Sequence, residues 1–482
     1  MARRGPLNGS TEPDRRTSVF GSETSKQFIG LSSAVFDADH LDTMTSTRQN
    51  LERWPRATVR ALCCALALLL PLSFACTSEP PGTTVIEFWG MGREGELIDE
   101  LLPQFYAENP GIRVRTQQIP WTAAHEKLLT AFVGESTPDV SQMGNTWVPE
   151  FEAIGAIAPL DQMLAASEIV DINGYFPGIW QTNIVDGHLY GVPWYVDTRL
   201  IFYRTDIFAE AGWSEPPKSW SEWVRLMDVI REKKLAEWPA YLATNEWQPP
   251  VLLGLQTGSP ILNERGTHGE FSKPEFKEAF TFYTDLFARG YAPKLSYNQI
   301  SNVYQQFAEK DFAMIITGPW NVGEFRRRLP EDLQDDWSTA AVPGPDGQPY
   351  PGTSLAGGSS IVIFARSEKQ DASWKLLEFL SRPDIQLKFY GMSGNLPARR
   401  EAWESEVFRA DPAMRAFRTQ LENVTPTPKV PEWEQIASEV WEHAEMVIRG
   451  NVPVDRALEL LDRSTDSILE KRRWMLEQKE QP

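Results

Sequence analysis

The residues with the clearest chemical character in this sequence are its tryptophans. The chain has 482 residues and 18 tryptophans, several beside glycine, proline or amide residues in predicted loops. A flat indole face suits the C–H face of a sugar ring, while neighbouring carboxylates and amides suit its hydroxyls. For any single tryptophan, packing in a core is an equally good interpretation. The tryptophans in such surroundings are Trp121, Trp147, Trp194, Trp247, Trp320 and Trp433.

A glycine-rich motif, 90–95, matches GxGxxG between a predicted strand and a predicted helix, as in a dinucleotide site. Glu94 and Glu96 would compete with a pyrophosphate for the amides of the helix N-terminus, and Arg115 stands where an acidic residue is needed. These charges argue against a nucleotide. The segment is then a simple glycine turn, or a loop whose amides, with Arg93 and Glu94, face a neutral polar ligand.

Other catalytic and metal-binding chemistries have no support in the sequence. It contains no P-loop, GxSxG or HExxH motif, and its five histidines are scattered. The three cysteines are Cys63, Cys64 and Cys76, so disulfides, thiolate catalysis and cysteine-based zinc sites are excluded after Cys76. We therefore predict no metal and no cofactor.

Composition and charge set the class of protein. With 41% apolar and 23% charged residues the chain is an ordinary globular protein, long enough for two or three domain-sized units. The formal net charge of −19 makes nucleic acid an unsuitable partner, because binding it requires an excess of cations.

The N-terminal region predicts export. Three arginines precede an apolar run, 61–75, that is too short to span a bilayer and ends at Cys76. We predict a signal peptide over 44–75, beginning at Met44, and expect 1–43 to be a non-native or disordered extension.

Cys76 has two interpretations. Ser73 and Ala75 fit ordinary cleavage before Cys76, whereas a lone cysteine at this point fits lipidation, with 76–83 as a tether. The match to a bacterial lipobox is imperfect, because Ser73 and Phe74 replace the usual leucine and small residue. We favour lipidation of Cys76.

After the leader, predicted strands and helices alternate, as in βαβ units with a mostly parallel sheet. The predicted strands are 85–89, 112–114, 139–143, 189–192, 200–203, 313–317 and 360–364. Apolar spacing predicts helices over 97–106 and 276–287, another from an N-cap at Thr122 to Gly134, and two long helices after Pro431 and Pro453.

Five segments together resemble the extracellular solute-binding proteins of carbohydrate ABC importers, family 1, which includes maltose- and trehalose-binding proteins. The segments, spread from about Val85 to beyond Trp441, are 137–151 (TPDVSQMGNTWVPEF), 191–213 (GVPWYVDTRLIFYRTDIFAEAGW), 312–325 (FAMIITGPWNVGEF), 354–364 (SLAGGSSIVIF) and 394–403 (GNLPARREAW).

The resemblance implies an α/β fold of type II, with two lobes, each a mostly parallel sheet flanked by helices, and a ligand cleft at the hinge. We expect crossings near 195–197, 355–360 and 396–399. Lobe 1 would comprise 84–195 plus 360–397, and lobe 2 would comprise 196–359 plus 398–476.

The resemblance also implies ligand contacts from loops at the strand ends. Tyr195 would be an aromatic platform, Asp197 a hydroxyl acceptor, Trp320 the stacking tryptophan and Arg399 a donor. The full predicted set is Arg93, Glu94, Asn145, Trp147, Tyr195, Asp197, Trp247, Trp320, Gly357, Gly358, Ser359, Arg399 and Trp433. Many members of the family have an aspartate near the position of Asn145, where this chain has an amide, which leaves the choice of sugar open.

The predicted function is therefore a periplasmic or membrane-tethered receptor, a monomer without catalysis, that closes around a mono- or oligosaccharide and delivers it to ABC transporter permease subunits. Two other hypotheses stay open. One is a secreted glycoside hydrolase using Glu94 and Asp197 as a carboxylate pair, and the other is a non-catalytic surface adhesion protein.

Overall fold

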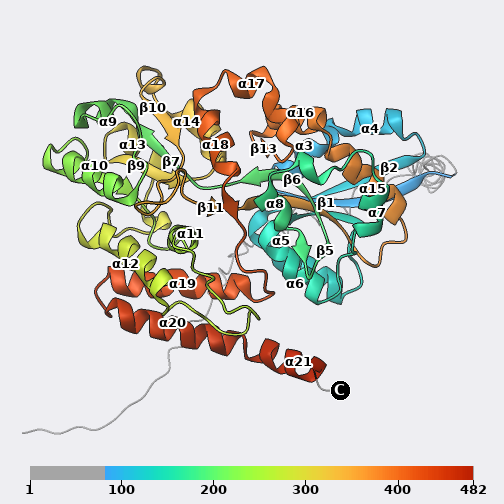
Figure 1. Ribbon diagram of the computed structural model, residues 1–482. Coiled ribbons are helices and arrows are strands. Elements are labelled where there is room, and N and C mark those ends of the chain that lie inside the picture. The colour runs from blue at the N-terminus through green and yellow to red at the C-terminus, as the bar shows by residue number, and fades with distance from the viewer. Residues whose placement is uncertain (1–81, 481–482) are drawn as a thin grey trace, which may run out of the picture. The chain divides into compact units, whose positions relative to one another are not determined.

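A computed structural model describes residues 82–480 of the chain. The predicted extension, signal peptide and Cys76 lie outside these residues. Two sheets organise the described part, and Figure 1 shows a group of helices around each of them. We call the six-stranded sheet the first sheet and the four-stranded sheet the second sheet.

The first sheet carries the N-terminal strands and the strands that return from later in the chain. Its spatial order is β13 (Leu396–Pro397), β6 (Val192–Asp197), β12 (Gly357–Ile363), β3 (Val140–Gly144), β1 (Thr84–Met91) and β2 (Ile112–Ile119). The second sheet has the order β10 (Trp337–Ala340), β7 (Leu200–Arg204), β9 (Phe312–Thr317) and β8 (Trp238–Tyr241). Two short pairs complete the strands: β11 (Ser354–Leu355) with β14 (Val424–Thr425), and β4 (Ile184–Val185) with β5 (His188–Leu189).

The prediction of mostly parallel sheets is wrong. In the first sheet, β1 is parallel to β2 and β3, but β12 is antiparallel to β3 and β6, and β13 is antiparallel to β6. In the second sheet only β8 and β9 are parallel. The antiparallel strands of the first sheet are those beside the crossings, where the chain enters or leaves the sheet directly instead of returning through a crossover helix.

Helices cover both sheets. Those that precede β6 are α3 (Glu94–Leu97), α4 (Leu102–Glu108), α5 (Trp121–Val133), α6 (Val148–Ala153), α7 (Asp161–Ala166) and α8 (Pro177–Gln181). Those between β7 and β10 are α9 (Thr205–Ala211), α10 (Trp220–Glu232), α11 (Gln248–Gln256), α12 (Pro274–Ala288), α13 (Val303–Ala308) and α14 (Trp320–Arg328).

Seven further helices follow β12. They are α15 (Gln370–Leu380), α16 (Pro383–Ser393), α17 (Glu406–Arg409), α18 (Pro412–Leu421), α19 (Trp433–Ile448), α20 (Val454–Ile468) and α21 (Glu470–Glu480). Single 3₁₀ turns lie at η3 (Ile98–Glu100), η4 (Asn145–Trp147), η5 (Ile172–Gly174), η6 (Tyr297–Gln299), η7 (Glu331–Leu333) and η8 (Arg400–Glu404). No helix among residues 82–480 is both long and apolar enough to cross a membrane.

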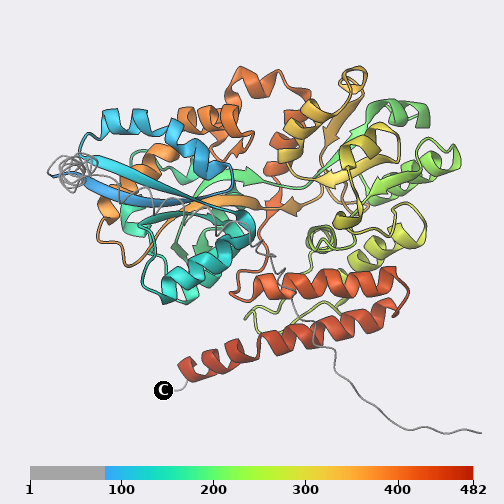
Figure 2. The same ribbon diagram turned by 180° about the vertical axis from the view of Figure 1, so that it is seen from behind.

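The buried apolar residues form three clusters, which lie on the faces of the two sheets. Phe88 and Ile361 belong to a cluster that continues through Trp194 into Phe202 and Phe325, so one layer of apolar packing extends from the first sheet to the second. A separate cluster fills the other face of the second sheet with residues of α10, α11, α12, α19 and α20, and a small third cluster lies beside α5 and α6. In Figures 1 and 2, α19 and α20 lie side by side beneath α12.

Three local predictions need correction. Helix α5 begins at Trp121 after Pro120, without a side-chain cap from Thr122, although it ends before Gly134 as expected. The predicted helix over 97–106 is divided into α3, η3 and α4, and Pro103 stands in the first turn of α4.

The third correction concerns β6. Of the predicted strand 189–192, Leu189 ends β5 and Val192 begins β6. The residues from Pro193 to Asp197, which lie between the predicted strands 189–192 and 200–203, form most of β6. The proline is accommodated because the pairing of β6 with β12 shifts register between Ser359 and Ser360, which disrupts the ladder locally.

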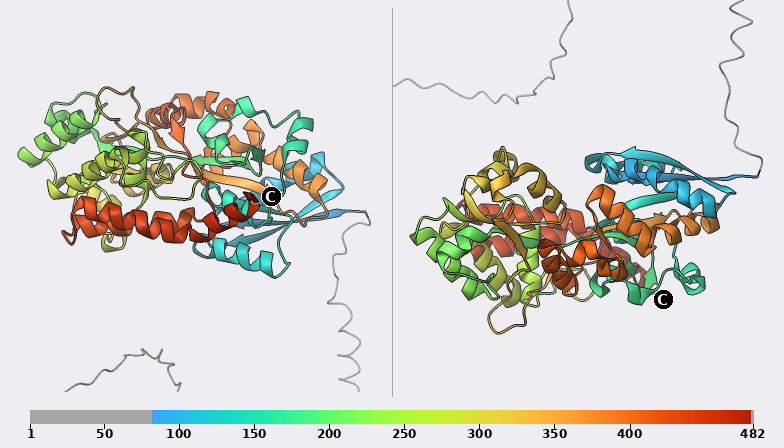
Figure 3. Two further views of the ribbon diagram at one scale, coloured as in Figure 1. Left: turned by 60° about the horizontal axis from the view of Figure 1, so that its bottom comes forward. Right: turned by 90° about the horizontal axis from the view of Figure 1, so that it is seen from above.

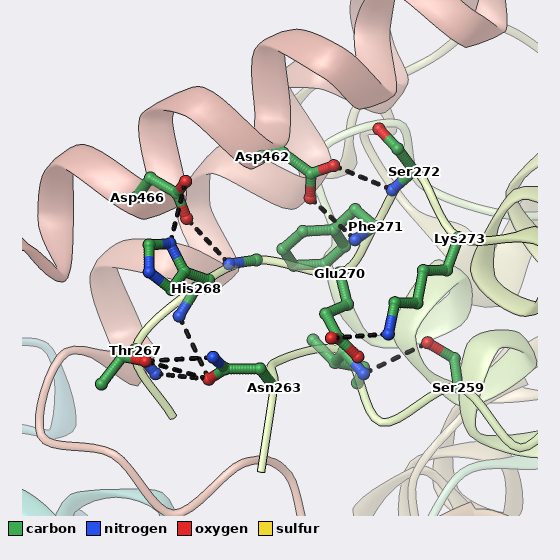
Figure 4. Close-up of polar contacts among 12 residues, drawn as sticks. Ser259, Asn263, Thr267, His268, Glu270, Phe271, Ser272, Lys273, Asp462 and Asp466 are labelled. Carbon is green, nitrogen blue, oxygen red and sulfur yellow. Dashed lines mark hydrogen bonds and ion pairs between the residues drawn. The ribbon is translucent and has the colours of Figure 1, made fainter. Parts of the chain in front are cut away.

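A long loop, 259–273, is fastened to α20 (Figure 4). Asp462 accepts hydrogen bonds from the backbone N–H groups of Phe271 (2.8 Å) and Ser272 (3.0 Å), and Asp466 accepts one from Gly269 (3.0 Å). Two aspartates of α20 therefore hold loop residues that are far from them in the sequence through backbone-to-carboxylate hydrogen bonds. Figure 3 shows α20 continuing into α21 towards the C-terminus.

Candidate functional site

The chain passes between the two sheets beside a pocket of about 530 Å³. Strand β6 ends at Asp197 in the first sheet and β7 begins at Leu200 in the second, while β11 leads back into β12. The pocket is lined by residues of both sheets and of their connections. The exact lobe ranges stay a prediction, but the first two predicted crossings lie beside this pocket.

Nine of the thirteen predicted site residues line the pocket. They are Glu94, Asn145, Trp147, Tyr195, Asp197, Trp247, Trp320, Gly357 and Gly358. Their lining the same space does not test whether they contact a ligand, so the ligand contacts stay a prediction.

Trp320 is the most exposed tryptophan in the predicted set, with 46% of its surface accessible. It begins α14, and a Cβ added to Gly318 would lie 2.0 Å from the indole ring. Only glycine at position 318 therefore allows the ring to take this position. Since almost half of Trp320 stays open, its surface is available to a ligand.

A second aromatic group lies on the first-sheet side of the pocket. The rings of Trp121 and Trp147 are 5.8 Å apart, and the His125 ring packs 5.1 Å from Trp147. His125 Nε2 lies 2.6 Å from Glu150 Oε2, and this hydrogen bond raises the pKa of His125 against the effect of burial. Trp121 lines the pocket, although the predicted set of site residues did not include it.

Carboxylates in the pocket have few partners. Glu94 accepts a 2.8 Å hydrogen bond from Asn395 Nδ2, and Glu434 accepts one of 2.6 Å from Thr146 Oγ1. Burial raises the pKa of Asp197, and the Arg199 guanidinium opposes that rise. Neutral donors hold the first two carboxylates, which leaves oxygen lone pairs for hydroxyl groups.

Tyr195 is placed differently from the predicted open platform. The residue is 9% exposed, its ring packs 5.9 Å from Trp194, and its hydroxyl accepts a hydrogen bond from Gln142 Nε2 (3.1 Å). Burial, and then the charge of Glu94, raise its pKa well above the usual range. Tyr195 therefore lines the pocket with only a small part of its surface exposed.

The glycines after Ala356 also differ from the expected loop. Gly357 and Gly358 belong to β12, where they pair with Asp197 and Val196 of β6. A Cβ on Gly358 would lie 2.3 Å from the Tyr195 carbonyl oxygen, so the close approach of the strands requires glycine. Asn145 is buried and donates to the Ala356 carbonyl oxygen (3.0 Å).

Four predicted residues do not line the pocket. Arg93 is exposed beside it. Ser359 is buried and donates to the Met143 carbonyl oxygen (3.0 Å). Trp433 is buried, and its ring lies 5.5 Å from that of Trp247, so it packs against a residue that lines the pocket.

Arg399 is the fourth. Its guanidinium donates to the carbonyl oxygens of Ile169 (2.9 Å) and Ser381 (3.1 Å) and lies 5.3 Å from the Tyr175 ring centroid. Long-range packing buries this arginine away from the pocket lining, so the proposed ligand contacts do not include Arg399.

Sequence reasoning missed several lining residues besides Trp121. Asn395 and Arg199 stand inside motifs quoted for the resemblance, and Glu434 directly follows Trp433, so a signal existed for these three. The lining residues outside the predicted set include Trp121, Thr146, Thr198, Arg199, Gln248, Pro319, Asn395, Thr427 and Glu434.

Comparison with known proteins gives consistent results. Residues 90–387 match the family described as bacterial extracellular solute-binding protein. The solved structure of the sugar-binding protein MalE from Xanthomonas citri is 46% identical in sequence and has a TM-score of 0.79, covering 82% of this chain and 100% of that chain.

Two curated relatives are more distant. The diacetylchitobiose binding protein DasA of Streptomyces coelicolor is 26% identical over 72% of this chain and 80% of its own length. The sn-glycerol-3-phosphate-binding periplasmic protein UgpB of Escherichia coli K12 is 24% identical over 82% of this chain and 94% of its own length. The relatives thus include binders of both neutral and phosphorylated compounds.

Proposed function

Because this chain belongs to the bacterial extracellular solute-binding proteins, we propose that it captures a carbohydrate and delivers it to the permease of an ABC importer. The observation that carries the proposal is the pocket between the sheets, where tryptophan rings and carboxylates from both sides line one space of about 530 Å³. The 46% identity to a sugar-binding protein supports the same choice.

The lining suits a carbohydrate in two ways. The half-exposed Trp320 offers an apolar surface to the C–H groups of a sugar ring, and the Trp121–Trp147 pair offers another on the opposite side. Glu94, Glu434 and Asp197 offer acceptors for hydroxyl groups. Binding at such a site requires orientation and burial, and no covalent step.

Charge narrows the class of ligand. Among the described lining residues the acidic groups are Glu94, Asp197 and Glu434, and Arg199 is the single cation, already paired with Asp197 at 3.1 Å. An ionised phosphate would meet repulsion from the other two carboxylates. We therefore propose an uncharged sugar, in contrast to the glycerol phosphate named for UgpB.

Ligand capture would proceed by closure of the two sides of the pocket. The sheets are joined by short connections such as Thr198–Arg199, which suit a hinge. Small-angle scattering should show a smaller radius of gyration with saturating sugar than without it. An unchanged radius would contradict closure while leaving binding intact.

A thermal-shift screen over neutral mono-, di- and trisaccharides, including maltose and trehalose, tests the function itself. A ligand at 100 times its Kd should stabilise the protein by about 2.7 kcal/mol, which a melting curve detects readily. No shift with any sugar would contradict the proposal and favour an adhesion protein. Release of reducing sugar from an oligosaccharide would instead establish a glycoside hydrolase.

The family is extracellular, and we propose that this chain is held at the membrane through a lipid on Cys76 and acts as a monomer. Mass spectrometry of the mature protein tests the anchor. A diacylglyceryl thioether on the N-terminal Cys76 supports it, whereas an unmodified Cys76 thiol contradicts it.

A further inference from the structure

Arg199 has a special place in the pocket. It stands in the two-residue connection between β6 and β7, and its side chain is only 13% exposed. Among the described residues that line the pocket it is the only lysine or arginine. Its backbone carbonyl oxygen accepts a 2.9 Å hydrogen bond from Ser354 Oγ, which fixes the main chain at this point.

The guanidinium makes two different contacts at once. Its Nη1 lies 3.1 Å from both carboxylate oxygens of Asp197, and its Cζ lies 4.8 Å from the centroid of the Trp320 ring. Asp197 ends a strand of the first sheet, whereas Trp320 follows β9 of the second. A single cation therefore connects the predicted hydroxyl acceptor to the predicted stacking ring.

Arg199 also balances more than one partly buried acid. Burial raises the pKa of Glu246, and the positive charge of Arg199 opposes this rise, as it does for Asp197. The nearby charges of Asp197 and Glu246 repel each other. Glu94 also lines the pocket, so the surroundings of Arg199 are strongly acidic.

We propose that Arg199 is a positioning residue that holds Asp197 and Trp320 together as one ligand-binding unit. The inference rests on the proposed function only where it names a sugar as the ligand. The contacts of Arg199 with Asp197 and Trp320 exist without a ligand. A planar guanidinium can pair with a carboxylate and cover an aromatic ring together, which a lysine ammonium cannot do with the same geometry.

The first experiment needs no ligand. Melting temperatures of Arg199→Gln, Arg199→Lys and wild type are measured between pH 5 and pH 8, with Arg225→Gln on the exposed surface of α10 as the control. Without the cation, burial raises the pKa values of Asp197 and Glu246 further above those of the unfolded chain. Carboxyls with a raised pKa destabilise the fold when they are ionised. The melting temperature of Arg199→Gln should therefore lie further below that of the wild type at pH 8 than at pH 5.

Arg199→Lys should remove most of that pH dependence, because the charge remains. It should still shift the NMR signal of the Trp320 indole N–H, identified as the signal missing in Trp320→Phe, because the planar contact with the ring is lost. A deficit independent of pH and an unmoved Trp320 signal would overturn the proposal.

The second experiment is a double-mutant cycle, titrated with maltose or with the sugar that gives the largest shift in the screen. Arg199→Gln should weaken binding roughly tenfold to a hundredfold in the wild type. In a Trp320→Leu background the same change should cost about threefold or less, because the unit is already broken.

The outcomes separate the two proposals. Losses that simply multiply would show that Arg199 does not act through Trp320. If no sugar binds at all, the proposed function fails, while the melting and NMR experiments still decide whether Arg199 organises Asp197 and Trp320.

Discussion

Two acidic regions of this molecule use the same chemical group, the carboxylate, in different surroundings. At the junction of loop 259–273 with α20, Asp462 accepts two backbone hydrogen bonds, and Asp466 accepts one and lies 3.2 Å from His268 (Figure 4). In the pocket, the Glu94 and Glu434 carboxylates each accept one bond from a neutral side chain.

The two regions differ in the donors that their carboxylates meet and in what lies beside them. A carboxylate that accepts backbone N–H groups stabilises a loop, whereas one that is held by a single neutral side chain at the wall of a pocket can also accept hydroxyls from a ligand. An acidic residue in this chain therefore cannot be assigned to structure or binding by type alone; its partners decide.

The largest effect is expected at the stacking ring. Trp320→Ala should weaken sugar binding by 2–4 kcal/mol, about 30- to 1,000-fold, because it removes an apolar anchor. The melting temperature of the free protein should barely change, since 46% of Trp320 is already exposed. Calorimetric titration and melting curves measure both quantities.

Trp474→Ala on α21, where the tryptophan is 61% exposed, is the matched control and should leave affinity unchanged. A large fall in melting temperature with near-normal affinity for Trp320→Ala would mean that the ring belongs to the core.

Next in size is the effect of neutralising a carboxylate of the pocket. Glu94→Gln should weaken binding of a neutral sugar by about 1.5–2 kcal/mol, because a charge-assisted hydrogen bond is lost. Glu96→Gln, two residues away, exposed and outside the pocket lining, should have no effect in the same titration. Equal losses of affinity for both variants would mean that Glu94 acts only through its negative charge and not through a hydrogen bond to the sugar.

At the junction of loop 259–273 with α20, we expect a loss of stability instead of a loss of affinity. Asp462→Ala should lower the free energy of unfolding by about 1–2 kcal/mol, because two backbone N–H groups lose their acceptor, and it should leave affinity unchanged. Denaturant melts compare it with Glu459→Ala, which removes only a surface pair with Arg456 on the same helix. Weakened sugar binding in Asp462→Ala would remove the distinction between the regions.

The smallest effect concerns pH. The hydrogen bond that His125 donates to the Glu150 carboxylate raises the pKa of His125 above that of the unfolded chain. Its stabilising contribution is therefore complete below the unfolded pKa of about 6.5 and is lost as pH rises through the folded pKa. Wild type should lose about 1 kcal/mol or less over this range relative to His125→Gln, measured by melting against pH.

His188→Gln, which alters an exposed pair with Asp161, is the control and should reproduce the wild-type pH profile. If His125→Gln also keeps that profile, the pair with Glu150 does not contribute to stability.

Local sequence was sufficient for much of this protein. Apolar patterns predicted β1, β9 and α12 close to their observed bounds, and they predicted two long helices after Pro431 and Pro453, where α19 and α20 begin. The need for a residue without Cβ at position 318, two before Trp320, involves neighbouring residues only, although the structure is what reveals it.

Other features depended on contacts between distant segments. The strand directions of the first sheet follow from where the chain crosses between sheets, and Pro193 could enter β6 only because β12 shifts register beside it. No pattern within either segment contains that information.

The arginines show the limit most plainly. Arg199 and Arg399 both stand in motifs typical of the family, and only Arg399 was predicted to face the ligand. The side-chain chemistry is the same, but Arg399 is enclosed by carbonyl groups at Ile169 and Ser381, whereas Arg199 lies between Asp197 and Trp320 at the pocket. Sequence determined which residues could bind a polar ligand, and tertiary packing decided which of them still have a free face, because burial depends on segments hundreds of residues apart.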